Sequence, residues 1–393
     1  MNISQLRAET PGCAERIHLN NSGSSLMPDP VLTVIRQYID LESRIGGYEA
    51  HAAMAGAFDD AYRAVAQLVG SSARNIAFTE SATVSFAQAV SSVPFERGDI
   101  ILTTRNDYNS NQIQFLSLRD RLGVAVVRAP DGDAGGVDVG VMEEMIRGLR
   151  PRLVSVTHVP TNSGLVQDVR SIGSVCREEG VLYLVDACQS VGQMPVDVDA
   201  IGCDFLSATS RKFLRGPRGS GFLFVSDRVL DLGLAPLFPD LRGAEWVEAD
   251  RYELADSAIR FETWESYFAL ILGTAEAARY AMSIGLESIQ QRVRLLADGL
   301  RERLARIDGV RLLDRGAELA AIVSCEPAGH DPAEVVAALR KRGINLSAQS
   351  RTAAVIDNTD KGVTASLRLS PHYYNTEEEI EAAVDALRHC LSE

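Results

Sequence analysis

Short apolar runs alternate with amphipathic stretches between about residues 75 and 225. Apolar runs rich in β-branched residues and bounded by turn residues predict buried strands. Seven such runs occur, at 75–79, 99–104, 124–129, 153–159, 181–187, 204–210 and 221–225. Stretches such as 137–149 and 168–180 have helical spacing and predict the helices between these strands. Such strand–helix alternation predicts a mainly parallel sheet covered by helices on both faces.

The pattern changes after about residue 255, where longer amphipathic stretches surround a few short apolar runs. The longer stretches predict helices at 263–282, 285–306, 331–342 and 376–391. We therefore expect an α/β protein with two domains. A large domain with the mainly parallel sheet spans 16–260, and a smaller α+β domain spans 261–393 together with 1–15. Ligands of parallel sheets bind at the carboxyl ends of the strands, so polar residues there are candidates for a site.

The amino-acid composition indicates which classes of protein this chain can belong to. The 393 residues are 46% hydrophobic and 23% charged, as in globular proteins, and the net charge of −14 argues against nucleic-acid binding. No apolar run is long enough to span a bilayer, and the first residues do not resemble a signal segment. We expect a cytoplasmic location without membrane contact. Six cysteines and six histidines lack metal-ligand spacing, so no metal site is expected.

Lysine is rare in this chain, with only Lys212, Lys341 and Lys361 among 39 cationic residues. Lys212 follows the predicted strand 204–210 and precedes a glycine-rich turn. A partly desolvated lysine at a strand's carboxyl end can lose its proton and form a Schiff base with an aldehyde. A solvated loop lysine is the alternative. Lys341 at a helix end and Lys361 in a turn suggest structural roles, which favours Lys212 by elimination.

Asp186 stands near the end of the predicted strand 181–187. A carboxylate there can pair with a protonated pyridine nitrogen and so make a cofactor ring an effective electron sink. A helix cap is the alternative for an aspartate in this position. The neighbouring strand's Lys212 favours the functional interpretation, and Gln189 of the same loop could bind a ring hydroxyl.

Two further groups of residues have the chemistry of anion binding. Ser81, Ala82 and Thr83 follow the strand 75–79 and open a helix, whose free N–H groups suit a phosphate, although ordinary capping is the alternative. Arg368 ends a short strand before the last helix and could clamp a substrate carboxylate with two parallel hydrogen bonds. An ion pair with the glutamate-rich helix that follows is an equal alternative for Arg368.

Several motifs in the same order make the chain resemble the class V aminotransferases, a family that includes cysteine desulfurases and selenocysteine lyases. The stretches that carry the resemblance are 157–169, 181–193 and 204–225, and it extends from about residue 18 to about residue 380. It implies the fold-type I fold of transferases that depend on pyridoxal 5'-phosphate, with this cofactor on Lys212 and Asp186 at its ring nitrogen. It also implies a homodimer with the active site at the subunit interface.

The resemblance also implies roles for single residues. The cofactor phosphate would be bound by Ser81, Ala82, Thr83, Thr209 and Arg211. The cofactor ring and its hydroxyl would be contacted by Tyr108, Thr161, Asn162 and Gln189. The carboxylate of an amino-acid substrate would be contacted by Asn21 and Arg368. Cys188 falls where a small residue packs against the ring, and a buried small hydrophobe is the favoured interpretation.

Two departures from the family pattern bear on the reaction. The stretch 345–367 contains no cysteine, which disfavours persulfide chemistry, and Glu265 replaces a threonine that in relatives reaches the partner's phosphate. The segments around 210–220, 260–265 and 371–379 resemble a subgroup with isopenicillin-N-epimerase-like proteins and hercynylcysteine sulfoxide lyases. We therefore expect a carbon–sulfur β-lyase acting on a cysteine conjugate or its S-oxide. An aminotransferase, an amino-acid epimerase and a non-catalytic regulator that binds the cofactor are the alternatives, in that order.

Overall fold

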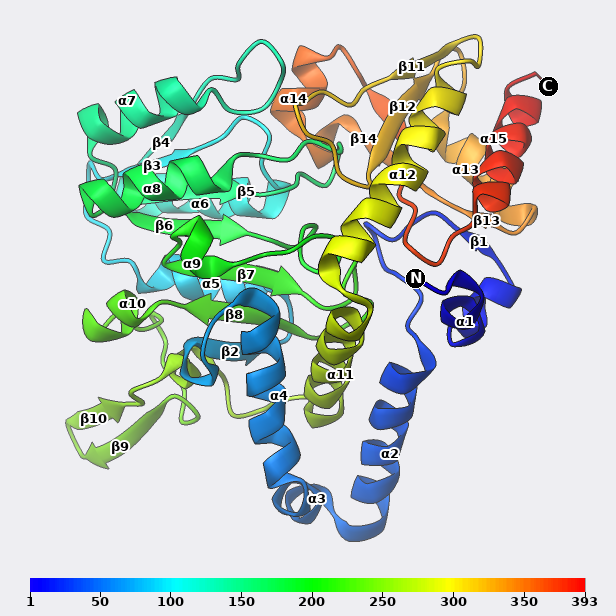
Figure 1. Cartoon of the computed structure of the whole chain (residues 1–393). Coiled ribbons are helices and arrows are strands. Elements are labelled where there is room, and N and C mark those ends of the chain that lie inside the picture. The colour runs from blue at the N-terminus through cyan, green and yellow to red at the C-terminus, as the bar shows by residue number, and fades with distance from the viewer. Residues whose placement is uncertain (393) are drawn as a thin grey trace.

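A seven-stranded sheet forms the centre of the molecule in the computed structural model, which describes residues 1–392 (Figure 1). Its strand order is β2-β8-β7-β6-β5-β3-β4, and only β8 runs antiparallel to its neighbours. The strands are β2 (Ile76–Thr79), β3 (Ile100–Thr103), β4 (Ala125–Arg128), β5 (Leu153–Thr157), β6 (Leu182–Asp186), β7 (Phe205–Thr209) and β8 (Gly221–Val225). Each lies inside one of the predicted apolar runs, so the mainly parallel sheet is confirmed.

Helices cover both faces of this sheet. They are α5 (Ala82–Ser92), α6 (Asn109–Leu122), α7 (Val139–Leu149), α8 (Val169–Glu179), α9 (Val198–Ile201) and α10 (Asp227–Asp231). Every residue of β5 to β8 is buried, which explains why these strands are continuous apolar runs rather than alternating ones. Local signals set the helix ends: the Asp168 side chain accepts a hydrogen bond at the start of α8, and Gly180 ends that helix at φ +66°.

A second, four-stranded antiparallel sheet lies in the C-terminal part of the chain, with strand order β11-β12-β15-β14. Its strands are β11 (Val310–Leu312), β12 (Val323–Pro327), β14 (Ser347–Ser350) and β15 (Ala365–Leu369). The helices around it are α12 (Leu286–Leu304), α13 (Pro332–Lys341), α14 (Val355–Asp360) and α15 (Glu377–Ser392). Near the amino terminus, after α1 (Ile3–Ala8), the short strand β1 (Ile17–His18) pairs with β13 (Ile344–Asn345). The domain limits expected from the sequence stay a prediction.

Helix α11 (Phe268–Ile284) packs against α2 (Asp29–Ile45) and α4 (Ala55–Val69). The short helix α3 (Gly47–Ala53) lies between α2 and α4 in the chain. The predicted start of α11 at residue 263 is wrong. Residues 262–267 form a loop instead, in which the backbone N–H of Trp264 donates to Asp240 over 2.6 Å.

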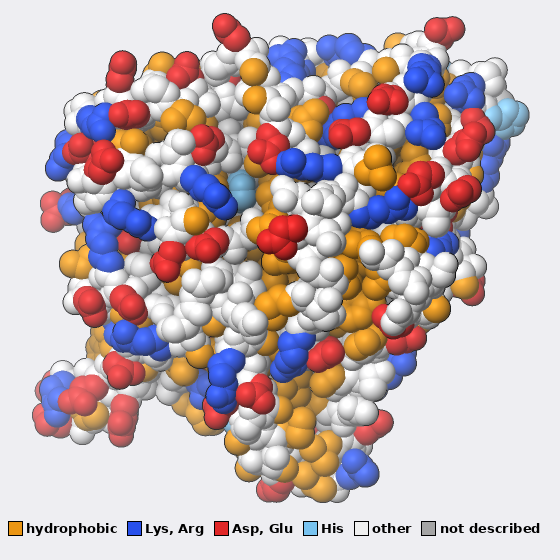
Figure 2. Space-filling view, in the orientation of Figure 1, with side chains coloured by type: hydrophobic (Ala, Val, Ile, Leu, Met, Phe, Trp, Pro, Cys, Tyr) orange, Lys and Arg blue, Asp and Glu red, His pale blue; other side chains and the backbone are white. Residues whose placement is uncertain are grey.

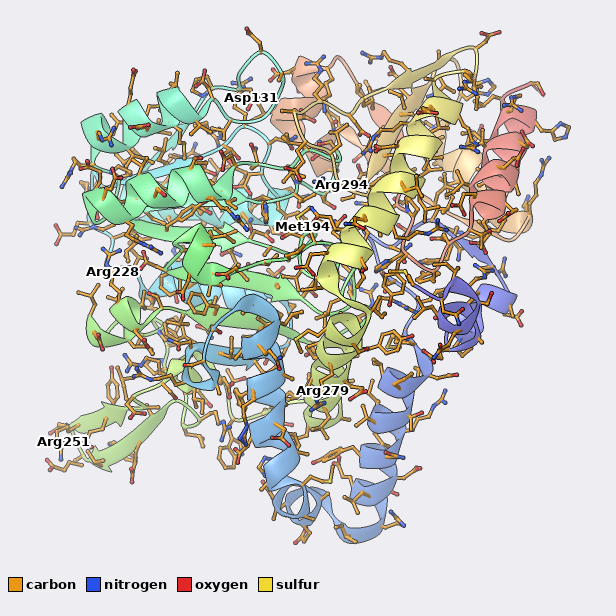
Figure 3. All side chains as sticks on the ribbon, viewed as in Figure 1. Asp131, Met194, Arg228, Arg251, Arg279 and Arg294 are labelled. Atoms are coloured by element: carbon orange, nitrogen blue, oxygen red, sulfur yellow. The ribbon has the colours of Figure 1, made fainter. Side chains whose placement is uncertain are left out.

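A hairpin of β9 (Ala244–Glu248) and β10 (Arg251–Leu254) projects from the body of the molecule (Figure 1). Arg251 lies on this projection in Figure 3 and forms an ion pair of 2.8 Å with Glu248. None of the helices formed by residues 1–392 combines the length and the hydropathy needed to cross a membrane.

Candidate active site

The carboxyl ends of β5, β6 and β7 meet at one edge of the central sheet. These strands are parallel neighbours, and their register places Thr157 beside Asp186, and Asp186 beside Ser207. The residues that follow the three strands therefore come together, and Lys212 lies in the turn just beyond β7. This is the edge at which parallel sheets bind their ligands.

Lys212 is a buried amine, with 6% of its surface exposed. Its Nζ lies 5.7 Å from the centroid of the Tyr108 ring, and no carboxylate of residues 1–392 lies within ion-pair distance of it. Burial lowers the pKa of Lys212, while Cys188 and Asp186 oppose the shift. The surroundings thus shift the equilibrium toward the neutral, nucleophilic amine, which does not fit a solvated loop lysine.

Asp186 is buried and held by donors on both oxygens. Its Oδ2 accepts from Nδ2 of Asn111 over 3.0 Å, and its Oδ1 accepts from the backbone N–H of Cys188 over 3.0 Å. Turns follow it in the chain, so it does not act as a helix cap. The carboxylate therefore has a fixed orientation at the sheet edge, as a partner of a cationic ring nitrogen requires.

The start of α5 and the loop after β7 supply donors for an anion. Ser81 is the N-cap of α5, its Oγ accepting from Val84 over 3.3 Å, with Ala82 and Thr83 in the first turn. Arg211 Nη1 donates to Thr209 Oγ1 over 2.9 Å, whereas its buried Nε has no hydrogen-bond partner. A helix N-terminus and an incompletely satisfied guanidinium are both groups that suit a phosphate.

Because Gly221 has no side chain, the start of α5 can lie in close contact with β8. A Cβ there would lie 2.6 Å from the Ala208 carbonyl oxygen and 3.0 Å from the Ala82 nitrogen. Any side chain at this position would therefore push the helix N-terminus away from the sheet edge.

Thr161 is the centre of a second polar group. Its Oγ1 is within 3.0 Å of Gln189 Nε2 and 2.7 Å of Arg368 Nη1. Gln189 Oε1 is buried without a partner. Asn162 does not join this group, because its Nδ2 donates to Asp357 of α14 over 2.6 Å.

Arg368 lies on β15 and is 7% exposed. The ion pair considered as an alternative does not form: Glu377 and Glu379 of α15 bind Arg292 and Arg7 over 2.5 and 2.8 Å. Burial lowers the pKa of Arg368 to about 10, and its Nε has no partner. The arginine is therefore a buried cation facing the site, without an anion from the part of the chain described.

Asn21 is fully buried, and its side chain is already bound on both sides. Its Nδ2 donates to the Ser370 carbonyl over 2.8 Å, and its Oδ1 accepts from the Tyr374 hydroxyl over 2.6 Å. A contact between Asn21 and a substrate carboxylate would require one of these hydrogen bonds to open.

Sequence reasoning missed three buried residues of the site. Asp107 directly precedes Tyr108, Asn111 lies in the first turn of α6, and His158 follows β5. Burial lowers the pKa of His158 to about 4, so this ring is neutral. The signal for the first two was the run of polar residues directly after the predicted strand 99–104.

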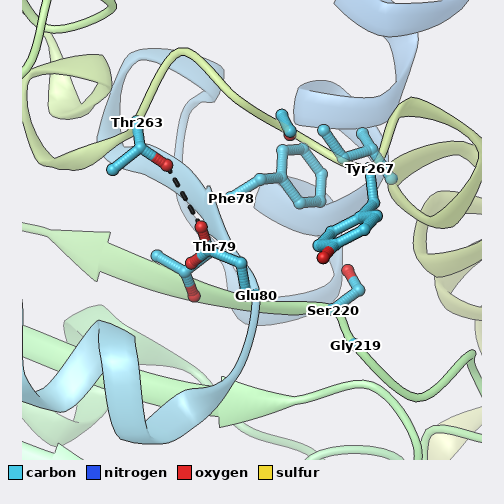
Figure 4. A pocket seen from close by; sticks show the side chains of 9 residues that line it. Phe78, Thr79, Glu80, Gly219, Ser220, Thr263 and Tyr267 are labelled. Atoms are coloured by element: carbon cyan, nitrogen blue, oxygen red, sulfur yellow. Dashed lines mark hydrogen bonds between the residues drawn. The ribbon is translucent and has the colours of Figure 1, made fainter.

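The loop before α11 reaches the region beside the start of α5. A small pocket there is lined by residues 78–80 and 219–220 together with Thr263, Ser266, Tyr267 and Ile271. Thr263 Oγ1 donates to Glu80 Oε1 over 3.1 Å (Figure 4). Glu265, which replaces the family's threonine, is exposed in this loop.

These residues fit pyridoxal phosphate. The free Nε of Arg211 suits its phosphate, the free Oε1 of Gln189 suits its ring hydroxyl, and the free Nε of Arg368 suits the carboxylate of an amino acid. Lys212 supplies a buried amine and Asp186 a fixed carboxylate. The orphaned polar atoms thus match the groups of the cofactor and of an amino-acid substrate.

Comparisons with known proteins agree with this assignment. The family model described as aminotransferase class-V matches residues 17–383. A probable cysteine desulfurase of Methanothermobacter thermautotrophicus is 30% identical, over 98% of this chain and 98% of its own length. A probable cysteine desulfurase of Pyrococcus abyssi is 28% identical over 98% and 97%.

Solved structures show the same fold. The apo structure of a cysteine desulfurase from Thermococcus onnurineus has a TM-score of 0.91 at 27% identity, covering 99% of this chain and 98% of its own. The cysteine desulfurase CsdA of Escherichia coli has a TM-score of 0.91 at 22% identity, over 100% and 99%. The fold, the arrangement of the site and the family match together show that this chain belongs to the class V aminotransferase family and is an enzyme that depends on pyridoxal phosphate.

Proposed function

We propose that the enzyme is a carbon–sulfur β-lyase that acts on a cysteine conjugate or its S-oxide. Relatives over the full length are named cysteine desulfurases, which supports a sulfur-containing amino acid as the substrate class. The observation that carries the proposal is the absence of a cysteine from the segment that closes the site next to Arg368.

That segment comprises β14 and α14 together with the residues around them, 345–367, and it contains no cysteine. It lies against the site, because Ser347 pairs with Arg368 across the sheet and Gln349 Nε2 is 3.5 Å from the Thr161 carbonyl. A desulfurase that captures sulfur as a persulfide needs a thiolate there. Without one, a sulfur group cleaved from Cβ leaves as a free product.

Cys188 is the cysteine beside Lys212 and Asp186, and it does not substitute for the missing one. It is buried, and both burial and Asp186 raise the pKa of its thiol. A protonated, buried thiol is a poor nucleophile. This supports its interpretation as a small side chain packed beside the cofactor ring.

The geometry supports the following roles for the remaining residues. The bound cofactor acts as an electron sink that makes the α-hydrogen of the amino acid acidic. We assign Asp186 to the ring nitrogen, Arg211 and the start of α5 to the phosphate, and Thr161 and Gln189 to the ring hydroxyl. Arg368 orients the substrate carboxylate, and the neutral amine of Lys212 accepts the α-proton.

Product analysis tests the reaction type. With a cysteine conjugate or its S-oxide, the lyase releases pyruvate and ammonia over many turnovers without added keto acid. A single turnover that only pyruvate or 2-oxoglutarate renews would instead establish an aminotransferase. Exchange of the α-hydrogen with loss of optical activity, but without pyruvate, would establish an epimerase.

We also propose a homodimer. Hydrophobic side chains gather on the molecular surface over α11 and the neighbouring α2 and α4 (Figure 2). A hollow of about 590 Å³ near these helices is lined by exposed hydrophobic residues, among them Ile39, Tyr48, Trp264 and Tyr267. An apolar surface of this kind is typical of an interface between subunits.

A further inference from the structure

A second buried carboxylate lies close to Asp186. Asp107 follows β3, is 5% exposed, and is separated from Asp186 by the side chain of Asn111. Nδ2 of Asn111 donates both to Asp107 Oδ1, over 3.2 Å, and to Asp186 Oδ2, over 3.0 Å. The two hydrogens of one amide group are therefore shared between two aspartates.

Asp107 is bound by five donors. Its Oδ1 accepts from the Tyr108 backbone N–H over 2.7 Å, from Asn111 and from the Thr157 hydroxyl. Its Oδ2 accepts from the Thr103 hydroxyl over 2.9 Å and from Gln112 Nε2 over 3.1 Å. Burial and the nearby Asp186 raise the pKa of Asp107 above its usual range, and the five donors, which suit an ionised carboxylate, oppose this shift.

Arg128 lies at the other end of the hydrogen-bond network that contains Asp107 and Asp186. Gln112 Oε1 accepts from Arg128 Nε over 2.9 Å and from Nη2 over 2.6 Å, which fixes the orientation of the glutamine amide. The Gln112 nitrogen must then point to Asp107. A continuous chain of hydrogen bonds thus runs from Arg128 on β4 through Gln112, Asp107 and Asn111 to Asp186.

We propose that Asp107 is a positioning residue for the cofactor: it holds the Asn111 amide on Asp186 and adds a second negative charge behind the ring. If Asp107 did not accept from Nδ2, the Asn111 side chain could turn its oxygen toward Asp186, and the two acceptors would repel. The inference rests on the proposed place of Asp186 at the ring nitrogen, but not on the proposed substrate.

The test measures the cofactor in the holoenzyme without substrate. Two negative charges near a bound cationic cofactor raise the apparent pKa at which its visible absorbance changes. Asp107→Asn removes one charge and should lower this pKa by about one unit. Thr103→Val is the matched control, because it removes one hydrogen bond to the same carboxylate but keeps the charge and the contact with Asn111. It should move the pKa by less than about a third of that amount.

A double-mutant cycle tests whether the effect passes through Asn111. In an Asn111→Leu background, Asp107→Asn should lower the apparent pKa by less than half as much as in the native chain. Equal shifts in both backgrounds would show that Asp107 acts through its charge alone and would overturn its role in positioning Asn111. No shift in the native chain would overturn both roles. If Asp107→Asn does not fold, Asn111→Leu alone keeps the test, since it should weaken retention of the cofactor on dialysis about tenfold; unchanged retention contradicts the proposal.

Asp186→Asn separates this inference from the assignment on which it rests. If Asp186→Asn leaves the apparent pKa of the cofactor unchanged, the place of Asp186 at the ring nitrogen is wrong, and the inference falls with it. If Asp186→Asn shifts the pKa and Asp107→Asn does not, only the role of Asp107 is refuted.

Discussion

Lys212 and Arg368 are buried basic side chains with no carboxylate within ion-pair distance in the part of the chain described. Burial of an unpaired charge costs several kcal/mol. Burial lowers the pKa of Lys212 and so favours loss of its proton, whereas Arg368 remains charged at neutral pH because its pKa of about 10 is still well above 7. In the proposed function, Lys212 is therefore the nucleophile and base, and Arg368 is the site for an anion.

Lys212 should be the residue that carries the cofactor. Borohydride reduction of the holoenzyme should fix the cofactor on the peptide containing Lys212, as peptide mass spectrometry can show. Lys212→Ala should lower turnover at least about 100-fold, because the general base is lost. Lys341→Ala, at the end of α13, is the control and should react as the native chain does. A label on Lys341 or Lys361 would refute the assignment.

Arg368→Lys should act mainly on substrate binding. The substitution keeps the positive charge but removes the planar fork of donors that fits a carboxylate. We expect KM to rise about tenfold, in proportion to one lost charge-assisted hydrogen bond, with a smaller change in kcat. Steady-state kinetics check this. A large fall in kcat at constant KM would instead mean that Arg368 acts on the reacting atoms.

Two aspartates of helix α14, Asp357 and Asp360, form ion pairs in different surroundings. Asp357 accepts from Asn162 and from the buried Lys361, both over 2.6 Å. Asp360, three residues on, pairs with Arg105 over 2.5 Å at the surface, where the two side chains are 44% and 36% exposed. Ion pairs in these two settings differ widely in energy.

Asp357→Ala should therefore destabilise the protein much more than Asp360→Ala. Removal of Asp357 leaves Lys361 buried without its partner, which should cost about 3 kcal/mol, whereas the exposed pair should contribute less than about 1 kcal/mol. Urea unfolding of the two variants measures the difference. Equal, small effects would show that Lys361 reaches solvent when its partner is removed.

The apolar surface over α2, α4 and α11 predicts that the protein assembles as a homodimer. Light scattering should give twice the chain mass of 42.6 kDa. Tyr48→Asp, at a residue 76% exposed beside the hollow, should weaken the dimer about tenfold or more, since charged residues are disfavoured in interface cores. Leu295→Asp, at a residue 60% exposed on α12, is the control. A native chain that stays monomeric would refute the homodimer.

Sequence reasoning alone predicted the seven strands of the central sheet, helices between them and the cofactor. Buried parallel strands are continuous apolar runs, and short-range signals such as Asp168 and Gly180 set the helix ends. The family motifs around Asp186 and Lys212 depend on the order of residues along the chain, which the sequence gives directly.

Which polar side chains contact each other could not be predicted from the sequence and became clear from the three-dimensional fold. Asp107 and Asp186 are separated by 79 positions in the chain and share one amide, because β3 and β6 flank β5 in the sheet. Asn162 likewise binds Asp357 in the fold. Glu377 and Glu379 of α15 bind Arg292 and Arg7 rather than Arg368. Hydrogen bonds depend on distances of a few ångströms between strands and loops, and the one-dimensional pattern of apolar and polar residues does not contain those distances.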